Sequence, residues 1–86
     1  MGRTERTTKE TSRQVLAFIR RSIRENGYSP TLREICDGLD ISSTSVAAYH
    51  IELLVKQGLI TRKRGIPRSM RPTRRAKAEP ESELNP

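Results

Sequence analysis

The reactive side chains of this sequence are few, since it has a single cysteine, Cys36, and a single histidine, His50. One of each cannot supply the four ligands of a structural zinc site, and a nucleophilic pair would need both groups exposed and adjacent. Cys36 falls on an apolar helical stripe, where an inert buried thiol is expected, and we expect His50 to be packed and hydrogen-bonded. We therefore predict no enzyme, no cofactor and no metal site.

Positive charge is the second kind of chemistry. The 86 residues carry 17 Lys and Arg against 10 Asp and Glu, a net charge of +7, with a sequence pI near 10.5. The segment from Ile60 to Lys77 has eight basic residues and no acidic one. Side chains that neutralise phosphates release condensed counterions, so this composition favours nucleic acid as the partner.

An acidic membrane surface would also attract such a chain. No apolar run approaches the roughly 18 residues that span a bilayer, and Met1–Ser12 lacks the apolar core of a signal peptide. A lone cysteine also fits a reducing compartment. We predict a cytoplasmic protein with no membrane partner and no small-molecule ligand.

Two helices joined by a tight turn would position the charge. The first has apolar residues at i, i+3, i+4 and i+7, namely Leu32, Ile35, Cys36 and Leu39. Thr31 and Glu34 would form its capping box. The second carries a similar stripe, made of Ala47, Ile51, Leu54 and Val55. Gly38 marks the point where we expect the first helix to stop, and Ser42 or Ser43 should cap the second.

The flanking segments complete a three-helix winged helix-turn-helix, a fold that is mainly α with a small β-hairpin. An apolar side over residues 10–26 predicts the first helix, and extended Tyr28–Pro30 can add one short strand. The β-prone runs 59–62 and 68–71 predict a hairpin, the wing. We expect this domain over residues 10–72, between a disordered arm (1–9) and a disordered tail (73–86).

In a helix-turn-helix the second helix enters the DNA major groove. Ser43, Ser45, Ala48 and Tyr49 lie near its start and off its apolar stripe, so they are free to touch a partner. Tyr49 can instead pack on the wing, and Val46 can meet a thymine methyl or join the core. Arg62, Lys63, Arg64 and Arg68 are predicted phosphate contacts of the wing, with a solvated hairpin tip as the alternative. Thr31 and Ser42, at the starts of the two helices, are predicted phosphate contacts as well.

The run from Arg13 to Met70 resembles the N-terminal DNA-binding domain of the LexA repressor family, which controls the bacterial DNA-damage (SOS) response. Three motifs in the family's order carry the resemblance: NGYSPTLREI, SSTSVAAYHIELLVKQGLI and a wing ending in RGIPRSM. It implies a bacterial or phage, nucleoid-associated repressor that binds operator DNA as a dimer. The family's base-reading positions fall on Ser43, Ser45, Val46, Ala48 and Tyr49. LexA proteins often carry Asn or Glu at some of them, so the resemblance implies the mode of binding and not the operator sequence.

The LexA family continues into a self-cleaving, dimerising peptidase domain, whereas this sequence has no Ala-Gly cleavage dipeptide and few residues after the wing. We expect neither self-cleavage nor that dimer interface in this chain, although two copies on a palindromic site would raise its affinity. An alternative function is a winged-helix protein-interaction module that pairs with a full-length repressor or with RNA polymerase.

Overall fold

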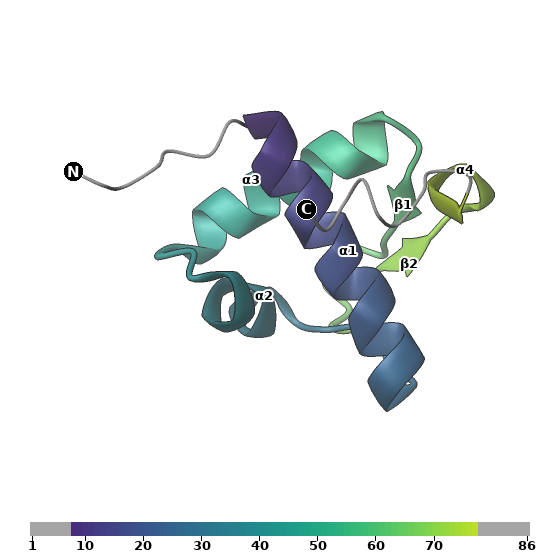
Figure 1. Ribbon diagram of the computed structural model, residues 1–86, viewed down its shortest axis with the longest axis horizontal. Coiled ribbons are helices and arrows are strands. Elements are labelled where there is room, and N and C mark those ends of the chain that lie inside the picture. The colour runs from purple at the N-terminus through teal and green to yellow at the C-terminus, as the bar shows by residue number, and fades with distance from the viewer. Residues whose placement is uncertain (1–7, 78–86) are drawn as a thin grey trace.

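The structure, a computed structural model, describes residues 8–77. Its elements are α1 (Thr8–Asn26), α2 (Leu32–Leu39), α3 (Thr44–Lys56), β1 (Ile60–Thr61), β2 (Arg71–Pro72) and α4 (Arg74–Lys77). The first three helices pack on one another and an antiparallel hairpin follows α3, which confirms the predicted fold class (Figure 1). Within the described residues, no helix has the length and apolar character needed to cross a membrane.

Helix α1 supplies the central side chains of the core. Val15, Leu16 and Ile19 are fully buried, and each such side chain stabilises the fold by about 1.5–3 kcal/mol. The helix begins at Thr8, two residues before the predicted Glu10. Its early residues Thr11 and Ser12 are buried against the rest of the domain. The other part of the predicted arm, residues 1–7, lies outside the described residues.

Side-chain caps begin both helices of the helix-turn-helix. Thr31 Oγ1 accepts a hydrogen bond from the Glu34 N–H (3.1 Å), and Glu34 Oε1 accepts one from the Thr31 N–H (3.0 Å), so the predicted capping box is confirmed. Ser43 rather than Ser42 caps α3, with Oγ accepting from the Ser45 N–H at 3.1 Å. Caps of this kind contribute about 1 kcal/mol each.

The prediction that the first helix stops at Gly38 is wrong. Helix α2 continues to Leu39 and ends at Asp40, which takes the left-handed conformation with φ 58°, a conformation that Asp tolerates better than most residues. Gly38 instead faces the ring of Phe18, where a Cβ would lie 2.6 Å from Cζ and nearer still to Cε2. The glycine therefore serves the close packing of α2 on α1.

The wing consists of β1, β2 and the loop between them, residues 62–70. Ile60 pairs with Pro72 and Thr61 with Arg71, so the predicted second strand over 68–71 is wrong except at its last residue. Arg68 turns the chain with a φ of 58°, and Ser69 Oγ bonds both the N–H and the C=O of Lys63 at 3.0 Å. These contacts join residues 63 and 69 within the loop, so the loop is closed by side-chain hydrogen bonds and only two residues of each strand pair.

The segment 28–30 is extended but forms no strand, so the prediction of a short strand there is wrong. Ser29 and Pro30 are buried, and the Tyr28 carbonyl accepts a hydrogen bond from Ser22 Oγ at 3.1 Å. The segment is held by side chains of α1 and of the wing, so its backbone has no strand partner among the described residues.

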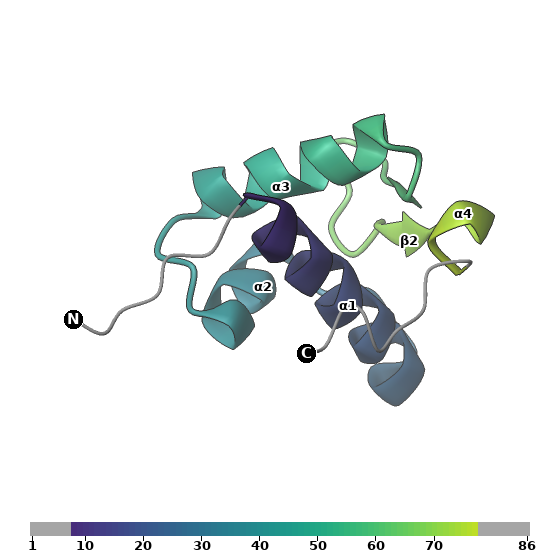
Figure 2. The same cartoon turned by 45° about the horizontal axis from the view of Figure 1, so that its top comes forward.

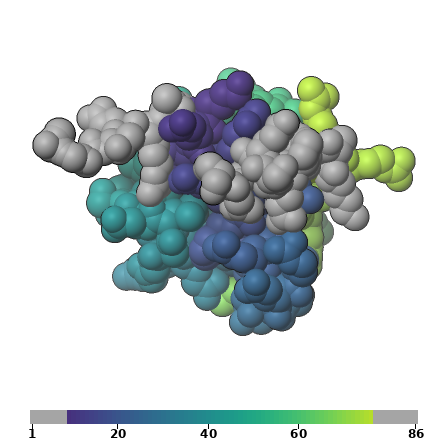
Figure 3. All heavy atoms as spheres, in the orientation of Figure 1, coloured from purple at the N-terminus to yellow at the C-terminus, as the bar shows by residue number. Residues whose placement is uncertain are grey.

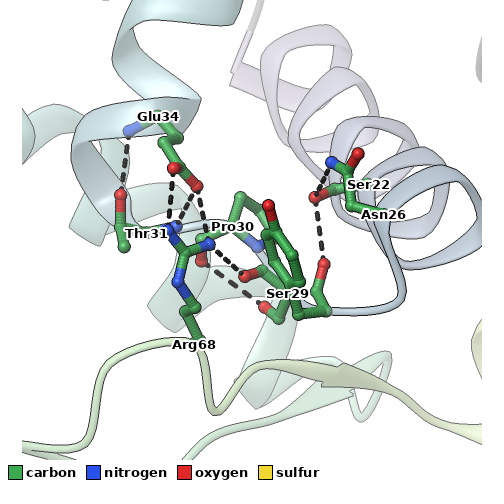
Figure 4. A network of polar contacts seen from close by, with 8 residues as sticks. Ser22, Asn26, Ser29, Pro30, Thr31, Glu34 and Arg68 are labelled. Carbon is green, nitrogen blue, oxygen red and sulfur yellow. Dashed lines mark hydrogen bonds and ion pairs between the residues drawn. The ribbon is translucent and has the colours of Figure 1, made fainter.

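Arg68 fastens the wing to the start of α2 (Figure 4). Its guanidinium makes two parallel hydrogen bonds to the Glu34 carboxylate, Nη1 to Oε1 at 3.0 Å and Nη2 to Oε2 at 2.9 Å. Nη1 also donates to the Ser29 carbonyl at 3.1 Å, and Cζ lies 4.6 Å from the centroid of the Tyr28 ring. We call this arrangement the Arg68 clamp.

The packed region extends beyond residue 72, the predicted end of the domain. Helix α4 follows β2, and its Ala76 is fully buried. Arg20 Nη1 donates to the Ala76 carbonyl at 3.1 Å, and Thr73 Oγ1 donates to the Gly58 carbonyl at 2.6 Å. Residues 78–86 of the predicted tail lie outside the described residues.

The contact between Gly38 and Phe18 makes a prediction with a definite sign. We expect Gly38→Ala to destabilise the domain by about 1–3 kcal/mol in urea unfolding, because the new methyl group must displace the Phe18 ring. Helix propensity alone predicts a gain of about 1 kcal/mol. Asp37→Ala, at the exposed neighbouring position, is the control and should change stability by less than about 0.5 kcal/mol. A stabilised Gly38→Ala variant would contradict the packing argument.

The Arg68 clamp predicts a pH dependence of stability. The hydrogen bonds from Arg68 and then from the Thr31 N–H hold the pKa of Glu34 below its ordinary value of 4.5. The stabilisation from the Glu34 carboxylate is therefore complete above pH 4.5 and is lost as the pH falls through the lower folded pKa. Glu34→Gln should lower the Tm at pH 7, and its difference from wild type should shrink below about pH 4.5.

Glu25→Gln is the matched control for this pH series, since Glu25 is an exposed carboxylate at the end of α1. Its Tm should follow that of wild type across the series. A Tm difference for Glu34→Gln that stays constant down to about pH 3 would show that the clamp does not depend on the charge of Glu34.

Candidate nucleic-acid interface

Helix α3 has one buried face and one open face. Ala47, His50, Ile51 and Leu54 are buried. With 3.6 residues per turn, the opposite side carries Ser45, Tyr49, Glu52 and Lys56, and we call this set the open face. Figure 2 shows α3 lying along one edge of the molecule, above α1 and α2. In Figure 3, α1 and α2 fill much of the front and the green of α3 appears at the upper edge.

The predicted base-reading residues divide between this face and its flanks. Ser45 is exposed and Ala48 is half-buried, while Ser43 is half-buried in its capping role. Val46 is 44% exposed, so the alternative that it belongs to the core does not hold. All five residues therefore lie at the start of α3, and none of them is buried.

Tyr49 is the large aromatic side chain of the open face, with 55% of its surface exposed. Its ring meets the His50 ring edge-on, with 5.3 Å between centroids. It borders a groove of about 430 Å³ between α1 and α3, which is lined by Lys9, Ser12, Arg13, Leu16, Leu53, Leu54, Gln57 and Leu59 as well. The alternative of a tyrosine packed on the wing is therefore not what the structure contains.

His50 joins the open face to the core. Its Nδ1 lies 2.9 Å from Ser12 Oγ of α1, and the side chain is buried, as predicted. Burial lowers the pKa of His50 below its ordinary value of 6.5, which favours the neutral ring at pH 7. Cys36 is buried as predicted. Among residues 8–77, no group of three His, Cys, Asp or Glu side chains is placed to hold a metal ion.

The basic residues of the wing occupy three different environments. Arg64 and Lys63 are exposed at the tip, and the Arg64 side chain is 83% exposed. The Arg62 side chain is only 22% exposed, and its Nη1 donates to Glu52 of α3 at 3.4 Å. Arg68 points inward into the clamp with Glu34. The exposed positive charge of the wing therefore lies on Lys63 and Arg64 at its tip and on Arg71 of β2.

Two further predicted phosphate contacts lie at helix starts. Ser42 is exposed immediately before the α3 cap, and Thr31 Oγ1 is engaged in the capping box. Thr31 also borders a groove of about 320 Å³ between the start of α2 and the wing, together with exposed Arg33. Arg33 was not among the phosphate contacts predicted from the sequence.

Sequence reasoning also missed Glu52. Its carboxylate lies on the open face and contacts both Arg62 and Arg64, at 3.4 Å and 3.7 Å. The helical spacing from Ser45, seven residues earlier, placed it on that side of α3. Its two arginine partners come from the wing, and no helical period predicts a contact of that kind.

Comparisons with a family model and with known proteins point to the same family. The family model of the LexA DNA binding domain matches residues 6–69. A LexA repressor from Roseiflexus sp. is 54% identical over 50 residues, which cover 58% of this chain and 23% of that protein. One from Halorhodospira halophila is 41% identical over 67 residues, 78% of this chain and 30% of that protein. A third, from Anaeromyxobacter sp., is 45% identical over 64 residues, 74% and 28% of the two chains.

The chain spans less than a third of the length of these three relatives. The matched segment takes in α1, the helix-turn-helix and most of the wing loop. It also contains the open face of α3 and the Arg68 clamp. This chain therefore belongs to the LexA DNA binding domain family.

Proposed function

We propose that this chain is a sequence-specific double-stranded DNA-binding transcriptional regulator, a repressor that occupies operator DNA with α3 in the major groove and the wing on the backbone. The observation that carries the proposal is the open face of α3 beside a wing whose tip is cationic. The family match and the LexA repressor relatives support it.

Base reading is assigned to the start of α3. The hydroxyl groups of Ser43 and Ser45 can donate to or accept from base edges, and Tyr49 can contact a base edge or a thymine methyl. Val46 and Ala48 offer apolar contact to thymine methyl groups. The buried residues Ala47 and Ile51 on the opposite side hold these groups on a rigid helix.

Phosphate contacts are assigned to Lys63 and Arg64 at the tip, to Arg62, and to Ser42 and Thr31 at the helix starts. Arg68 is left out of the proposed set, because its guanidinium is already bound by Glu34 and the Ser29 carbonyl. Exchanging those partners for a phosphate would release the wing from α2. Contacts to the backbone fix the register of the protein on DNA, and the bases supply sequence preference.

A single domain of this size buries little surface on DNA, so one copy should bind weakly. Two copies on a palindrome, with half-sites about one helical turn apart, would raise the affinity. We propose a homodimer on DNA of this kind, acting in the cytoplasm at the nucleoid.

An unbiased selection of bound duplexes from a random library tests the proposal directly. We expect an enriched motif at about 150 mM salt, with two to four specified base pairs in each half-site and a two-fold symmetric arrangement. Repeating the selection with denatured protein sets the background. No enrichment above that background would remove sequence-specific binding from the proposal.

Substitutions separate base reading from phosphate binding. Tyr49→Ala should cost about 1–3 kcal/mol on the selected duplex and little on a scrambled one. Lys63→Gln should weaken both duplexes alike and reduce the slope of log K against log[salt] by about 1, whereas Arg64→Gln should weaken mainly the selected duplex. The wild-type slope should be about −4 to −5 for each protomer.

Arg21→Gln and Arg24→Gln, toward the far end of α1, are the matched charge controls and should leave both affinities close to wild type. A chain that keeps its regulatory function with Lys63→Gln and Arg64→Gln, and loses it with the α1 variants, would instead be a protein-interaction module.

A further inference from the structure

Glu52 puts a carboxylate in a surface where DNA phosphates would lie. It is the single acidic residue of α3, and it follows Tyr49 by one helical turn on the open face. Its side chain is 46% exposed. A negative charge there opposes phosphate binding unless a cation or a base donor faces it.

The Glu52 carboxylate meets two wing cations through the same oxygen. Oε2 accepts a hydrogen bond from Arg62 Nη1 at 3.4 Å and lies 3.7 Å from Arg64 Nη2. The Arg62 side chain is 22% exposed and the Arg64 side chain 83% exposed. Arg62 is therefore held against α3, whereas the contact of Arg64 is long, solvated and easily exchanged.

The two ion pairs of the wing differ in kind. Arg68 binds Glu34 through two bonds of 3.0 Å and 2.9 Å and also binds a backbone carbonyl. Arg64 has one contact to Glu52, at 3.7 Å. The base of the wing is thus fixed by a strong bidentate pair, while its tip is restrained by a weak one.

We propose that Glu52 is a specificity-determining residue of the DNA interface. In the free protein its carboxylate takes the place of a phosphate and holds Arg62 and Arg64 beside the open face. It thereby weakens binding to non-matching DNA, which contacts the protein through phosphates and not through bases. This inference rests on the proposed function. Glu52 acts as a positioning residue for both arginines and as a fixed negative charge facing the duplex.

Non-specific binding relies almost entirely on cations that neutralise phosphates. Glu52 lowers the charge that Arg62 and Arg64 can offer, and its own charge repels the backbone, so such loose complexes are weakened. On a matching site, Ser45 and Tyr49 add base contacts that do not depend on charge. On such a site Arg64 exchanges Glu52 for a phosphate, so the specific complex loses less than a loose one.

The test compares wild type with Glu52→Gln on a duplex selected by this protein and on a scrambled duplex of equal composition, by fluorescence anisotropy across a salt series. We expect Glu52→Gln to bind the scrambled duplex about threefold to tenfold more tightly at low salt. Its salt slope should steepen by about 1, because one more cation is free for phosphate. The ratio of the two affinities should fall.

Glu25→Gln is the matched control, because it makes the same change in net charge at the end of α1 that points away from α3 in Figure 2. It should leave the affinity ratio and the salt slope unchanged. In the double variant with Arg64→Gln, the steepening of the slope caused by Glu52→Gln should largely disappear, since the released cation is missing.

An unchanged affinity ratio and slope for Glu52→Gln would overturn the inference. So would an equal loss of affinity on both duplexes with an unaltered Tm, which would make Glu52 a simple contributor to binding. If wild type itself fails to distinguish the two duplexes, the proposed function fails. If wild type distinguishes them and Glu52→Gln behaves identically, the role of Glu52 alone is rejected.

Discussion

One carboxylate, Glu34, joins the wing to the start of the helix-turn-helix. The same side chain closes the capping box of α2 and receives the guanidinium of Arg68. Through Arg68 the bond extends to the Ser29 carbonyl and the face of Tyr28. The start of the helix-turn-helix, the α1–α2 connection and the wing are therefore joined at one point. Each strand of the hairpin has only two residues, so this bond adds to the burial of Ile60 and Met70 in orienting the hairpin.

Charge in the wing is distributed between fixing and binding. Arg68 is bound to Glu34 of α2, and Arg62 is partly buried against Glu52 of α3. Lys63 and Arg64 are exposed to solvent. A count of basic residues in the sequence therefore overstates the charge available to DNA. A guanidinium is available to a phosphate only if its contacts within the protein are weak. For Arg62, Arg64 and Arg68 those contacts are to the two helix glutamates, Glu34 and Glu52.

Local patterns predicted what local interactions determine. The capping box at Thr31, the apolar face of α1 and the burial of His50 and Cys36 follow from spacings of three to seven residues and were confirmed. The prediction of a helix stop at Gly38 was wrong, because a glycine is needed there to make room for the Phe18 ring of α1. The strand register and the inward turn of Arg68 were missed for the same reason, since Arg68 lies 34 residues from Glu34.

His50 connects the core to the open face of α3. Its ring is hydrogen-bonded to Ser12 of α1 and is in edge contact with the ring of Tyr49. Because burial lowers its pKa, the stabilisation from the neutral ring is complete above pH 6.5 and is lost as the pH falls through the lower folded pKa. The ring that anchors α3 to α1 thus supports the aromatic side chain of the open face. Reading bases with a rigid helix requires that its exposed residues be adjacent to its most firmly packed ones, and residues 49 and 50 meet that requirement.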